Sequence, residues 1–525
     1  MRSADATVAP AMGQDVTTFA GPSTDLETVI SALEARGFRF DGHEQESRTV
    51  LDTFDGRLAA EDLRLERRDG GQRELVLGGP GVVAAHVPAD TGVRFARDLP
   101  PGPFRARLAS TIEVRALAPQ LTVVGRLRRG EWRDGTGKVL ATVALRDGLR
   151  TDPSAADDLP GATLEIEHVV GYDKRARQTV AVIEDAGWHR VDGDTIGLAA
   201  VAAGVDLHGF TSSPTVPLDA RAPAIDGVRA VLANLAESIE ANWQGTVEDV
   251  DPEFLHDWRV AVRRTRSVLG ESKHVLPTAA GQEARERFRT LGRATGPARD
   301  LDVYIIEWPT YTAGLGAGVR EALGPALELL RRHRDEAQRN LVELLRAARA
   351  DGWLARWRSW LDGPVTDADQ GRDQHRPLGD HVAARIRASH RRLVDHGRPI
   401  RPDSPAEALH DLRKDAKRLR YMLECFGSLL PDHRRDRFVK RLKALQSNLG
   451  EHQDAEVHVH HLRLVSHELH EDGAAPGTLV AIGQLAEQLD RRRHATRVEF
   501  AEQFAAFDSK ATRRALRDML DGIDG

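Results

Sequence analysis

The sequence of 525 residues is short of several features whose absence excludes whole classes of protein. A single cysteine, Cys425, excludes an intramolecular disulfide and a thiolate metal cage, and it fits a reducing compartment. No stretch approaches the roughly 18 consecutive apolar residues of a membrane-spanning helix. Residues 1–16 lack a basic segment followed by an apolar run. We therefore expect a cytoplasmic protein with no membrane partner.

Sequence motifs of several common enzyme classes are also missing. The chain has no GxxxxGK[ST] loop, no serine elbow and no CxxC pair, so hydrolysis of nucleotides by a P-loop is not indicated. The net charge is −6 and the pI is about 6.4, so any binding of a polyanion must be local. Lysine is scarce, but four of the eight lysines fall in one short stretch of the chain: Lys414, Lys417, Lys440 and Lys443.

A basic segment occurs twice. HDWRVAVRRTRSVL at 256–269 returns as HDLRKDAKRLRYML at 410–423, an offset of 154 residues. RFRTLGRATGPARDLDV at 287–303 and RLKALQSNLGEHQDAEV at 441–457 keep the same offset. Two blocks in one register predict a duplicated structural unit.

Both copies of the basic segment separate charge from apolar side chains when they are laid out at about 100° per residue. In the first copy, one arc holds His256, Arg259, Arg263 and Arg266, and another holds Leu255, Trp258, Val262 and Leu269. In the second, the arcs are His410, Arg413, Lys417 and Arg420 against Leu409, Leu412, Ala416, Leu419 and Leu423. Each segment is thus expected to bury one stripe and present a cationic one.

Acids that could pair with these cations are few. Residues 256–267 carry four arginines against Asp257, and residues 410–421 carry five cations against Asp411 and Asp415, a net charge of +3 in each. A solvated face with i,i+4 ion pairs is the ordinary interpretation of such a helix. Repulsion without counter-ions, repeated in two copies, instead favours a groove that binds a polyanion.

The chain divides into two halves with different periodicity. We expect a disordered N-terminus at 1–13, a β domain at 14–205, a linker rich in Pro, Ser and Gly at 206–222, and a helical domain at 223–522. Alternating segments predict antiparallel strands at 48–54, 62–68, 73–78, 110–117, 138–146 and 163–170, with helices at 25–36 and 174–185. Beyond the linker, helices are predicted at 224–243, 252–271, 281–305, 319–349, 377–395, 405–427, 432–467, 477–506 and 509–521.

The duplicated HxxRxxxRRxR and HxxRKxxKRLRY segments, with the paired LG…RDLDV and LG…QDAEV segments, resemble the CHAD family, the conserved histidine α-helical domain. That resemblance implies an internally duplicated helical domain that binds inorganic polyphosphate and can direct proteins to polyphosphate granules. It assigns polyphosphate binding to His256, Arg259, Arg263, Arg264, Arg266, Arg289, Arg293, His410, Arg413, Lys414, Lys417, Arg418, Arg420, Tyr421, Lys440 and Lys443. Asp300 and Asp454 share a register and are interpreted as orienting the cations or capping a helix.

The segment LDTFDGRLAAEDLRLERR, with LEIEH further on, resembles the CYTH superfamily of triphosphate tunnel proteins. The resemblance implies an eight-stranded antiparallel tunnel lined by charged side chains. This sequence departs from the family's ExExK strand, because Gln14, Val16 and Thr18 stand there, and Gly78 replaces a phosphate-binding lysine. A residual anion site could use Arg57, Arg64, Arg68, Glu113, Arg126, Arg128, Glu165 or Glu167, and Glu113 and Arg115 are expected to alternate on one strand.

These observations predict an α+β multidomain protein, with an N-terminal antiparallel β-barrel or tunnel and C-terminal all-α duplicated helical bundles. The leading functional hypothesis is a polyphosphate-binding protein of the cytoplasm, associated with polyphosphate granules and without catalytic residues. Two alternatives stay open: a metal-dependent triphosphatase or polyphosphatase acting through the tunnel, and nucleic-acid binding by the basic grooves. Mg²⁺ or Mn²⁺ would be required only if the tunnel is active, and protein partners are not predicted.

A histidine-rich segment at 452–470 offers a further candidate. Helical spacing would bring Asp454, His458 and His461 together, and such a trio could hold a divalent ion. The first repeat has nothing comparable, so we interpret the segment as a solvated face and assign no metal.

Overall fold

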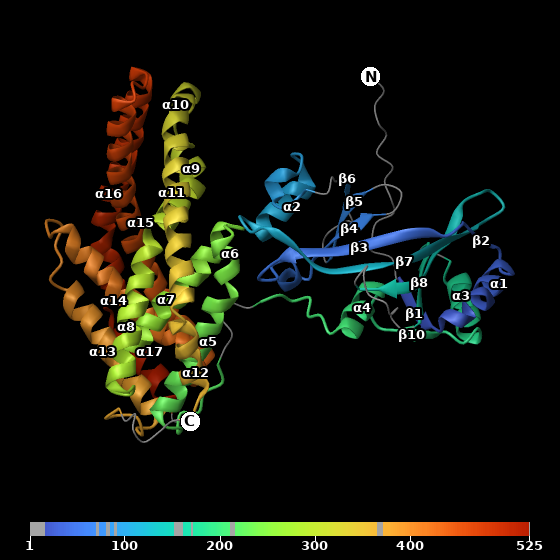
Figure 1. Ribbon diagram of the computed structural model, residues 1–525, viewed down its shortest axis with the longest axis horizontal. Coiled ribbons are helices and arrows are strands. Elements are labelled where there is room, and N and C mark those ends of the chain that lie inside the picture. Colours follow the sequence, from blue (N-terminus) through green and yellow to red (C-terminus); the bar gives the residue numbers. More distant parts are fainter. Residues whose placement is uncertain are drawn as a thin grey trace. The chain divides into compact units, whose positions relative to one another are not determined.

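The computed structural model describes residues 16–69, 73–79, 85–88, 92–151, 161–169, 172–210, 216–364 and 371–523. Residues 1–13, Gln14 and part of the expected linker at 206–222 lie outside the described residues. The chain forms two compact units, Met1–Ser212 and Ser213–Gly525 (Figure 1). The first is built around an antiparallel sheet and the second is helical, which confirms the predicted fold class.

Among the described residues of the first unit, ten strands make up one sheet, and every pairing is antiparallel. They are β1 (Thr17–Gly21), β2 (Phe38–Phe40), β3 (Glu44–Thr53), β4 (Arg64–Asp69), β5 (Glu74–Gly78), β6 (Ala85–Pro88), β7 (Leu117–Arg133), β8 (Val139–Arg150), β9 (Ala162–His168) and β10 (His189–Val191). Their order is β10-β1-β9-β8-β7-β3-β4-β5-β6, with β2 also paired to β7. No pairing joins β6 to β10 among the described residues, so this sheet is open, whereas a closed eight-stranded tunnel was predicted.

In the described part of this unit, four α-helices accompany the sheet: α1 (Leu26–Glu34), α2 (Pro103–Ile112), α3 (Asp173–Asp185) and α4 (Thr195–Ala203). Single 3-10 turns are η1 (Ser23–Asp25), η2 (Ala59–Glu61) and η3 (Ala96–Asp98). The strand predicted at 110–117 is wrong, because residues 110–112 are the end of helix α2. Pro103 stands at the start of that helix, where its fixed φ favours helix, and Phe104, Leu108 and Ile112 are buried one turn apart.

The helices cover both faces of the sheet. Phe19, Leu164 and Ile166 form one core cluster with α1 and α3, and Leu51, Leu65 and Leu77 form another with α2. The strand registers place these residues on one face. Helix α4 packs instead on the opposite face, where Ile196 and Ala199 cluster with Val50, Leu121 and Val123. The polar groups of that second face are therefore partly covered by the protein itself.

The helical unit contains α5 (Ala224–Ala241), α6 (Trp243–Val247), α7 (Pro252–Glu271), α8 (Thr278–Ala294), α9 (Gly296–Thr312), α10 (Ala317–Ala322), α11 (Gly324–Ala350), α12 (Trp353–Asp362), α13 (Leu378–Gly397), α14 (Ala406–Cys425), the turn η4 (Gly427–Leu429), α15 (Asp432–Glu471), α16 (Pro476–Phe507) and α17 (Lys510–Leu520). Most of the predicted helices are present. Helix α12 was not predicted, and it lies between the helices predicted at 319–349 and 377–395.

The duplication is visible in the helix boundaries. Helices α5, α7 and α8 begin at residues 224, 252 and 278, and α13, α14 and α15 begin at 378, 406 and 432, each 154 residues later. Pro223 and Pro377, at equivalent positions, form an antiparallel β-bridge. The two repeats therefore meet through corresponding segments.

The repeats differ at one break. The helix predicted at 281–305 is divided into α8 and α9 around Thr295, whereas α15 runs through the equivalent region without interruption. Pro297 lies in the first turn of α9, and Glu451 occupies the equivalent position in the second repeat. Proline has no N–H to donate and clashes with the preceding turn, so only the first copy breaks.

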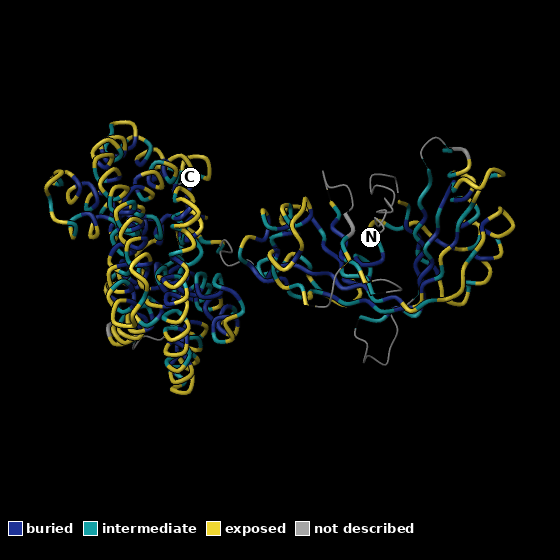
Figure 2. Tube along the Cα trace, turned by 90° about the horizontal axis from the view of Figure 1, so that it is seen from above, coloured by how far each residue is buried: buried dark blue, intermediate teal, exposed yellow. Residues whose placement is uncertain are grey.

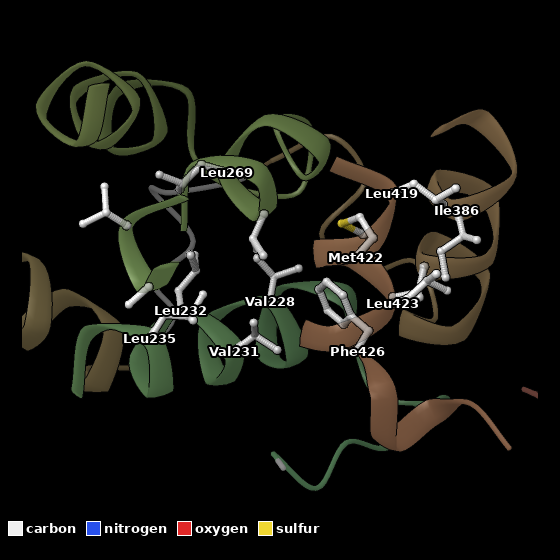
Figure 3. Packing of buried hydrophobic residues seen from close by; sticks show 14 of the residues in the cluster. Val228, Val231, Leu232, Leu235, Leu269, Ile386, Leu419, Met422, Leu423 and Phe426 are labelled. Atoms are coloured by element: carbon white, nitrogen blue, oxygen red, sulfur yellow. The ribbon is translucent and has the colours of Figure 1, made fainter. Parts of the chain in front are cut away.

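Helix α5 forms a central part of the helical core. Val228, Val231, Leu232 and Leu235 follow the i, i+3, i+4, i+7 spacing of one helix face and are buried. Figure 3 shows them facing Leu269 of α7, Met422 of α14 and Phe426, the residue that follows α14. In Figure 2 the buried stretches of this unit alternate with exposed ones along each helix, as an amphipathic bundle requires.

Candidate functional site

Helix α7 begins where the sequence supplies a cap. The Asp251 carboxylate accepts hydrogen bonds from the backbone N–H groups of Glu253 and Phe254, and Pro252 occupies the first helical position. The apolar arc of the helix, Leu255, Trp258, Val262 and Leu269, is buried. So is that of α14, formed by Leu409, Leu412, Ala416, Leu419 and Leu423. Burial of these arcs fixes the rotation of both helices and hence the direction of their cations.

The two helices pack against each other and form a shared cavity of about 340 Å³, which we call the central groove. Its lining is drawn from both repeats: His256, Arg259, Val260, Arg263, Arg299, Asp300, Val303, His410, Arg413, Lys414, Lys417, Gln453, Asp454, Val457 and His458. Seven of the predicted polyphosphate-binding residues are thus brought together: His256, Arg259, Arg263, His410, Arg413, Lys414 and Lys417.

Basic side chains outnumber acidic ones in the central groove. Six arginine or lysine side chains line it, against the carboxylates of Asp300 and Asp454. Arg413 lies 3.2 Å from Asp454, and Arg259 lies 3.9 Å from Asp300. These equivalent pairs orient two guanidinium groups without neutralising the rest.

Other cations of the groove have partners outside it or none. Arg299 reaches Glu253 at 3.5 Å and Lys414 reaches Asp411 at 2.9 Å. Arg263 and Lys417, at equivalent positions of the two repeats, form no side-chain hydrogen bond or ion pair within the part of the chain that the structure describes. They are the uncompensated charges at the centre of the groove.

Two cations of the groove have lowered pKa values. Burial, followed by repulsion from Arg263, lowers the pKa of Arg259 from 12.5 to about 10. Burial, followed by repulsion from Arg413, Arg263 and Arg259, lowers the pKa of Lys417 from 10.5 to about 7. Arg259 is only 7% exposed and its Nη1 donates to Thr295 Oγ1 at 2.8 Å. The site holds positive charge that its own carboxylates do not balance.

Further polar side chains complete the wall of the groove. His410 Nδ1 lies 2.7 Å from Gln453 Oε1, which anchors its ring at the rim. Tyr421 does not line the groove, but its electrostatic interaction with Arg259 slightly opposes the lowering of the pKa of Arg259. Arg299 and Gln453 were missed from the sequence as groove residues. Both directly precede the paired aspartates, so the in-register blocks already contained the signal.

Several predicted residues lie elsewhere. Arg264 and Lys443 line a separate cavity of about 310 Å³, and Arg264 donates to Glu424 at 2.9 Å. Arg418 pairs with Asp415 at 3.0 Å, and Arg420 pairs with Glu424 at 2.5 Å. Arg266 on α7 lies near Arg289 and Arg293 of α8, which contribute to lowering its pKa after burial and Arg263. Lys440 is exposed on α15.

The candidate tunnel residues fall into groups that do not converge. Arg64, Arg68, Glu165 and Glu167 occupy strand positions on the face covered by α4. Arg126 and Arg128 belong to the opposite face, where Arg126 pairs with Asp147 and Arg128 with Glu27. The structure therefore does not bring all of these residues together in one place.

Arg57 and Glu113 lie off the strands and pair with each other at 2.8 Å. Glu113 follows α2 with a φ of 53°, and Arg115 is buried near Asp55. The expected alternation of Glu113 and Arg115 along a strand is wrong, because this segment is a turn between α2 and β7.

On the α4-covered face, charges are matched within the protein. Arg48 donates to both oxygens of Glu66, at 2.9 and 3.1 Å, and Arg146 donates to Glu46 at 2.6 Å and to Glu165 at 2.7 Å. Despite burial, the nearby arginines lower the pKa of Glu66 to about 2 and hold that of Glu165 well below its usual range. Both carboxylates are ionised and already engaged.

Helix α4 closes this network. The backbone N–H and the hydroxyl of Thr195, at its first position, donate to Glu165 at 3.0 and 2.7 Å. Asp194, its N-cap, pairs with Arg64. On β1 the residue opposite Glu165 is Thr18, and Arg64 of β4 lies opposite Gly78 of β5. Glu165 and Arg64 are thus both held by contacts within the first unit.

The histidine-rich segment forms part of the continuous helix α15. His458 is buried and stacks on Tyr304 at 4.2 Å between ring centroids, while Asp454 turns to Arg413. Within the described ranges, no group of three or more His, Cys, Asp or Glu side chains is arranged to hold a metal ion. No helix in the described part of the chain combines the length and apolar character needed to cross a membrane.

Comparison with known proteins returns similarities for both units. An uncharacterised protein of Mycobacterium tuberculosis strain CDC 1551 is 29% identical over 262 residues, which are 48% of this chain and 48% of that protein. The chain spans about half the length of the curated relatives it matches. The solved CHAD domain from the plant Ricinus communis is 24% identical and covers 59% of this chain and 98% of that chain, with a TM-score of 0.43.

A candidate adenylyl cyclase from Hippeastrum, described as having a dominant triphosphatase activity, is 10% identical. It covers 37% of this chain and 99% of that chain, with a TM-score of 0.28. The family model of the CHAD domain matches residues 230–463, a range that contains the whole central groove. Residues 230–463 of this chain are a CHAD domain.

Proposed function

We propose that this protein binds inorganic polyphosphate in the central groove of its CHAD domain. The observation that carries the proposal is the convergence of equivalent cations from two repeats on one cavity with only two carboxylates. Polyphosphate is a linear chain of negative charges, and guanidinium groups bind phosphate oxygens through paired, charge-assisted hydrogen bonds. A bound chain would supply the counter-charge that Arg263 and Lys417 lack.

The lining favours polyphosphate over nucleic acid. Proteins that bind single-stranded nucleic acid stack bases on aromatic side chains, and double-stranded nucleic acid needs a surface matched to a helix. Among the described residues that line the groove, none is Phe, Tyr or Trp. Nucleic acid should therefore displace polyphosphate only weakly at equal phosphate concentration; equal displacement would favour the nucleic-acid alternative.

The N-terminal unit is proposed to act as a scaffold without phosphohydrolase activity. A metal-dependent triphosphatase needs carboxylates free to hold Mg²⁺ or Mn²⁺. Glu165 is committed to Arg146 and Thr195, and Glu66 to Arg48, so these residues do not fit a metal centre. Phosphate release from tripolyphosphate with either metal, above that of a heat-inactivated control, would revive the enzyme alternative.

Binding is tested most simply by reversing the two unpaired charges. The Arg263→Glu, Lys417→Glu variant should lose most of its affinity for long-chain polyphosphate in a calorimetric titration at moderate salt. A matched control, Arg339→Glu with Arg346→Glu, makes the same change in net charge at exposed positions of α11. The control should bind nearly as wild type. Equal affinity of both variants and wild type would sink the proposal.

Association with polyphosphate granules is the cellular consequence that we propose. A fluorescently tagged full-length chain should concentrate in foci in phosphate-loaded cells, and the Arg263→Glu, Lys417→Glu variant should stay diffuse. Foci that persist with the variant would mean that the groove is not what directs the protein there.

A further inference from the structure

The two repeats differ at the outer end of the cationic stripe. In the second repeat, Glu424 accepts hydrogen bonds from Arg264 at 2.9 Å and from Arg420 at 2.5 Å. The equivalent position in the first repeat, 154 residues earlier, is Gly270. A Cβ atom added there would meet no heavy atom within 4 Å outside the adjoining backbone of its own helix, so there is open space where a side chain would begin. The cationic stripe of the second repeat therefore ends at a carboxylate, and that of the first repeat does not.

On the open flank, three arginines gather without neutralisation. Arg266 and Arg293 form no ion pair within the residues that the structure describes, and Arg289 pairs only with Glu286, one turn away on α8. Both members of that pair are about half exposed, so the pair contributes little. We call Arg266, Arg289 and Arg293 the flank cluster. The equivalent positions of the second repeat are Arg420, which is paired, Lys443 and Ser447.

Arg263 connects the flank cluster to the groove. It lines the cavity, it repels Arg259 and Lys417 inside it, and it repels Arg266 outside it. Positive charge therefore continues from the cavity along the exposed side of α7 towards α8. Arginines gathered beside a single exposed carboxylate are costly as a solvated surface and are expected where an anion normally lies.

We propose that a polyphosphate chain longer than the cavity can hold leaves the central groove on the first-repeat side, over the flank cluster, while Glu424 blocks the second-repeat side. The inference rests on the proposed binding of polyphosphate in the groove. Its consequence is selectivity for length: short chains contact only the groove, whereas long chains gain the additional arginines. The asymmetry between Gly270 and Glu424 sets that selectivity.

The test transfers the carboxylate from one repeat to the other. In Gly270→Glu, the new carboxylate lies four residues after Arg266, the spacing at which Glu424 pairs with Arg420. The affinity of the full-length protein for long-chain polyphosphate should fall by at least about fivefold, the scale of one lost charge-assisted hydrogen bond. The affinity for tripolyphosphate should stay unchanged.

Gly270→Gln is the matched control, because it adds a side chain of the same size without charge. It should bind both probes as wild type does, and thermal unfolding should show that both variants fold, since glycine disfavours a helix interior. The reciprocal variant, Glu424→Gln, releases Arg264 and Arg420. It should raise the affinity for long chains severalfold and leave that for tripolyphosphate unchanged.

The outcomes separate this inference from the proposed function. If Gly270→Glu weakens both probes equally, or neither, the flank cluster does not select for length and the inference is overturned, while binding in the groove stands. If the wild-type protein binds neither probe, the proposed function itself fails. A loss confined to long chains, absent in Gly270→Gln, supports the inference.

Discussion

At the scale of single residues, Lys417 shows most clearly that the central groove contains unbalanced positive charge. Its amine is half-buried among three arginines, and its pKa is lowered from 10.5 to about 7. A residue selected only for stability would not be kept under such repulsion. The cost is reasonable if a polyanion supplies the missing charge when it binds.

Binding of polyphosphate should therefore be coupled to uptake of a proton. At about pH 8, Lys417 is mostly neutral in the free protein, and a bound phosphate chain raises its pKa again. Calorimetric titrations in buffers with different ionisation enthalpies should show proton uptake by wild type. The Lys417→Arg variant keeps its charge and should show much less uptake. Equal uptake by both would contradict the assignment of this proton.

The same repulsion should appear in stability. Because the folded pKa of Lys417 lies below its unfolded value, the unfolded state holds more protons between about pH 7 and 10.5. The free energy of unfolding thus rises with pH across this window, and below pH 7 the penalty is complete. Lys417→Met should raise the melting temperature by about 2 °C or more at about pH 6. A lower melting temperature would mean that Lys417 stabilises the fold.

At the scale of the elements, the buried apolar stripes of α7 and α14 fix the rotation of each helix and hence the direction in which its cationic side chains point. The sequence allowed this to be predicted, because the 3.6-residue period of apolar residues is strong in both copies. The sequence did not allow us to predict that the cations of these helices line two separate cavities. Arg264 lies one residue after Arg263 but turns to Glu424, and only the packing of α14 against α7 decides this.

Packing of α14 can be tested apart from its charge. Leu419 is fully buried, so Leu419→Ala should lower the free energy of unfolding by about 2–5 kcal/mol. Arg263→Ala on the facing helix removes an uncompensated charge and should not destabilise the protein. Urea unfolding of the two variants measures the contrast. Similar losses for both would show that Arg263 has a structural role.

In the N-terminal unit, the sequence misled in physically understandable ways. STIEVRAL alternates like a strand, but Pro103 and the buried Phe104 and Leu108 make its first residues the end of a helix. Helix α4 was missed because TIGLAAVAA is apolar around most of its circumference and shows no helical period. Which arginines are neutralised depends on pairings between strands far apart in the chain, which a single sequence does not give.

At the scale of the whole molecule, the two units divide charge in opposite ways. The sheet unit buries arginines and carboxylates in matched networks, and the helical unit leaves cations unmatched around a cavity. The overall charge of −6 hides this local excess. We therefore propose that anion binding belongs to the CHAD domain and that the sheet unit has a supporting role.

Glu165 tests that division. If it is structural, Glu165→Gln should destabilise the N-terminal unit by about 3–5 kcal/mol, because it leaves Arg146 and Arg48 with a buried charge that is only partly paired. Polyphosphate affinity should not change. Thermal unfolding and a binding titration on the full chain measure both effects. A variant that folds normally but loses polyphosphate affinity would assign Glu165 to a binding or catalytic site.

The most direct measurement is an experimental structure of the full-length protein with long-chain polyphosphate. Phosphate density should run through the central groove between Arg263 and Lys417, with contacts from equivalent residues of both repeats. Density at Arg64 and Arg68 of the sheet unit, with an empty groove, would contradict the account.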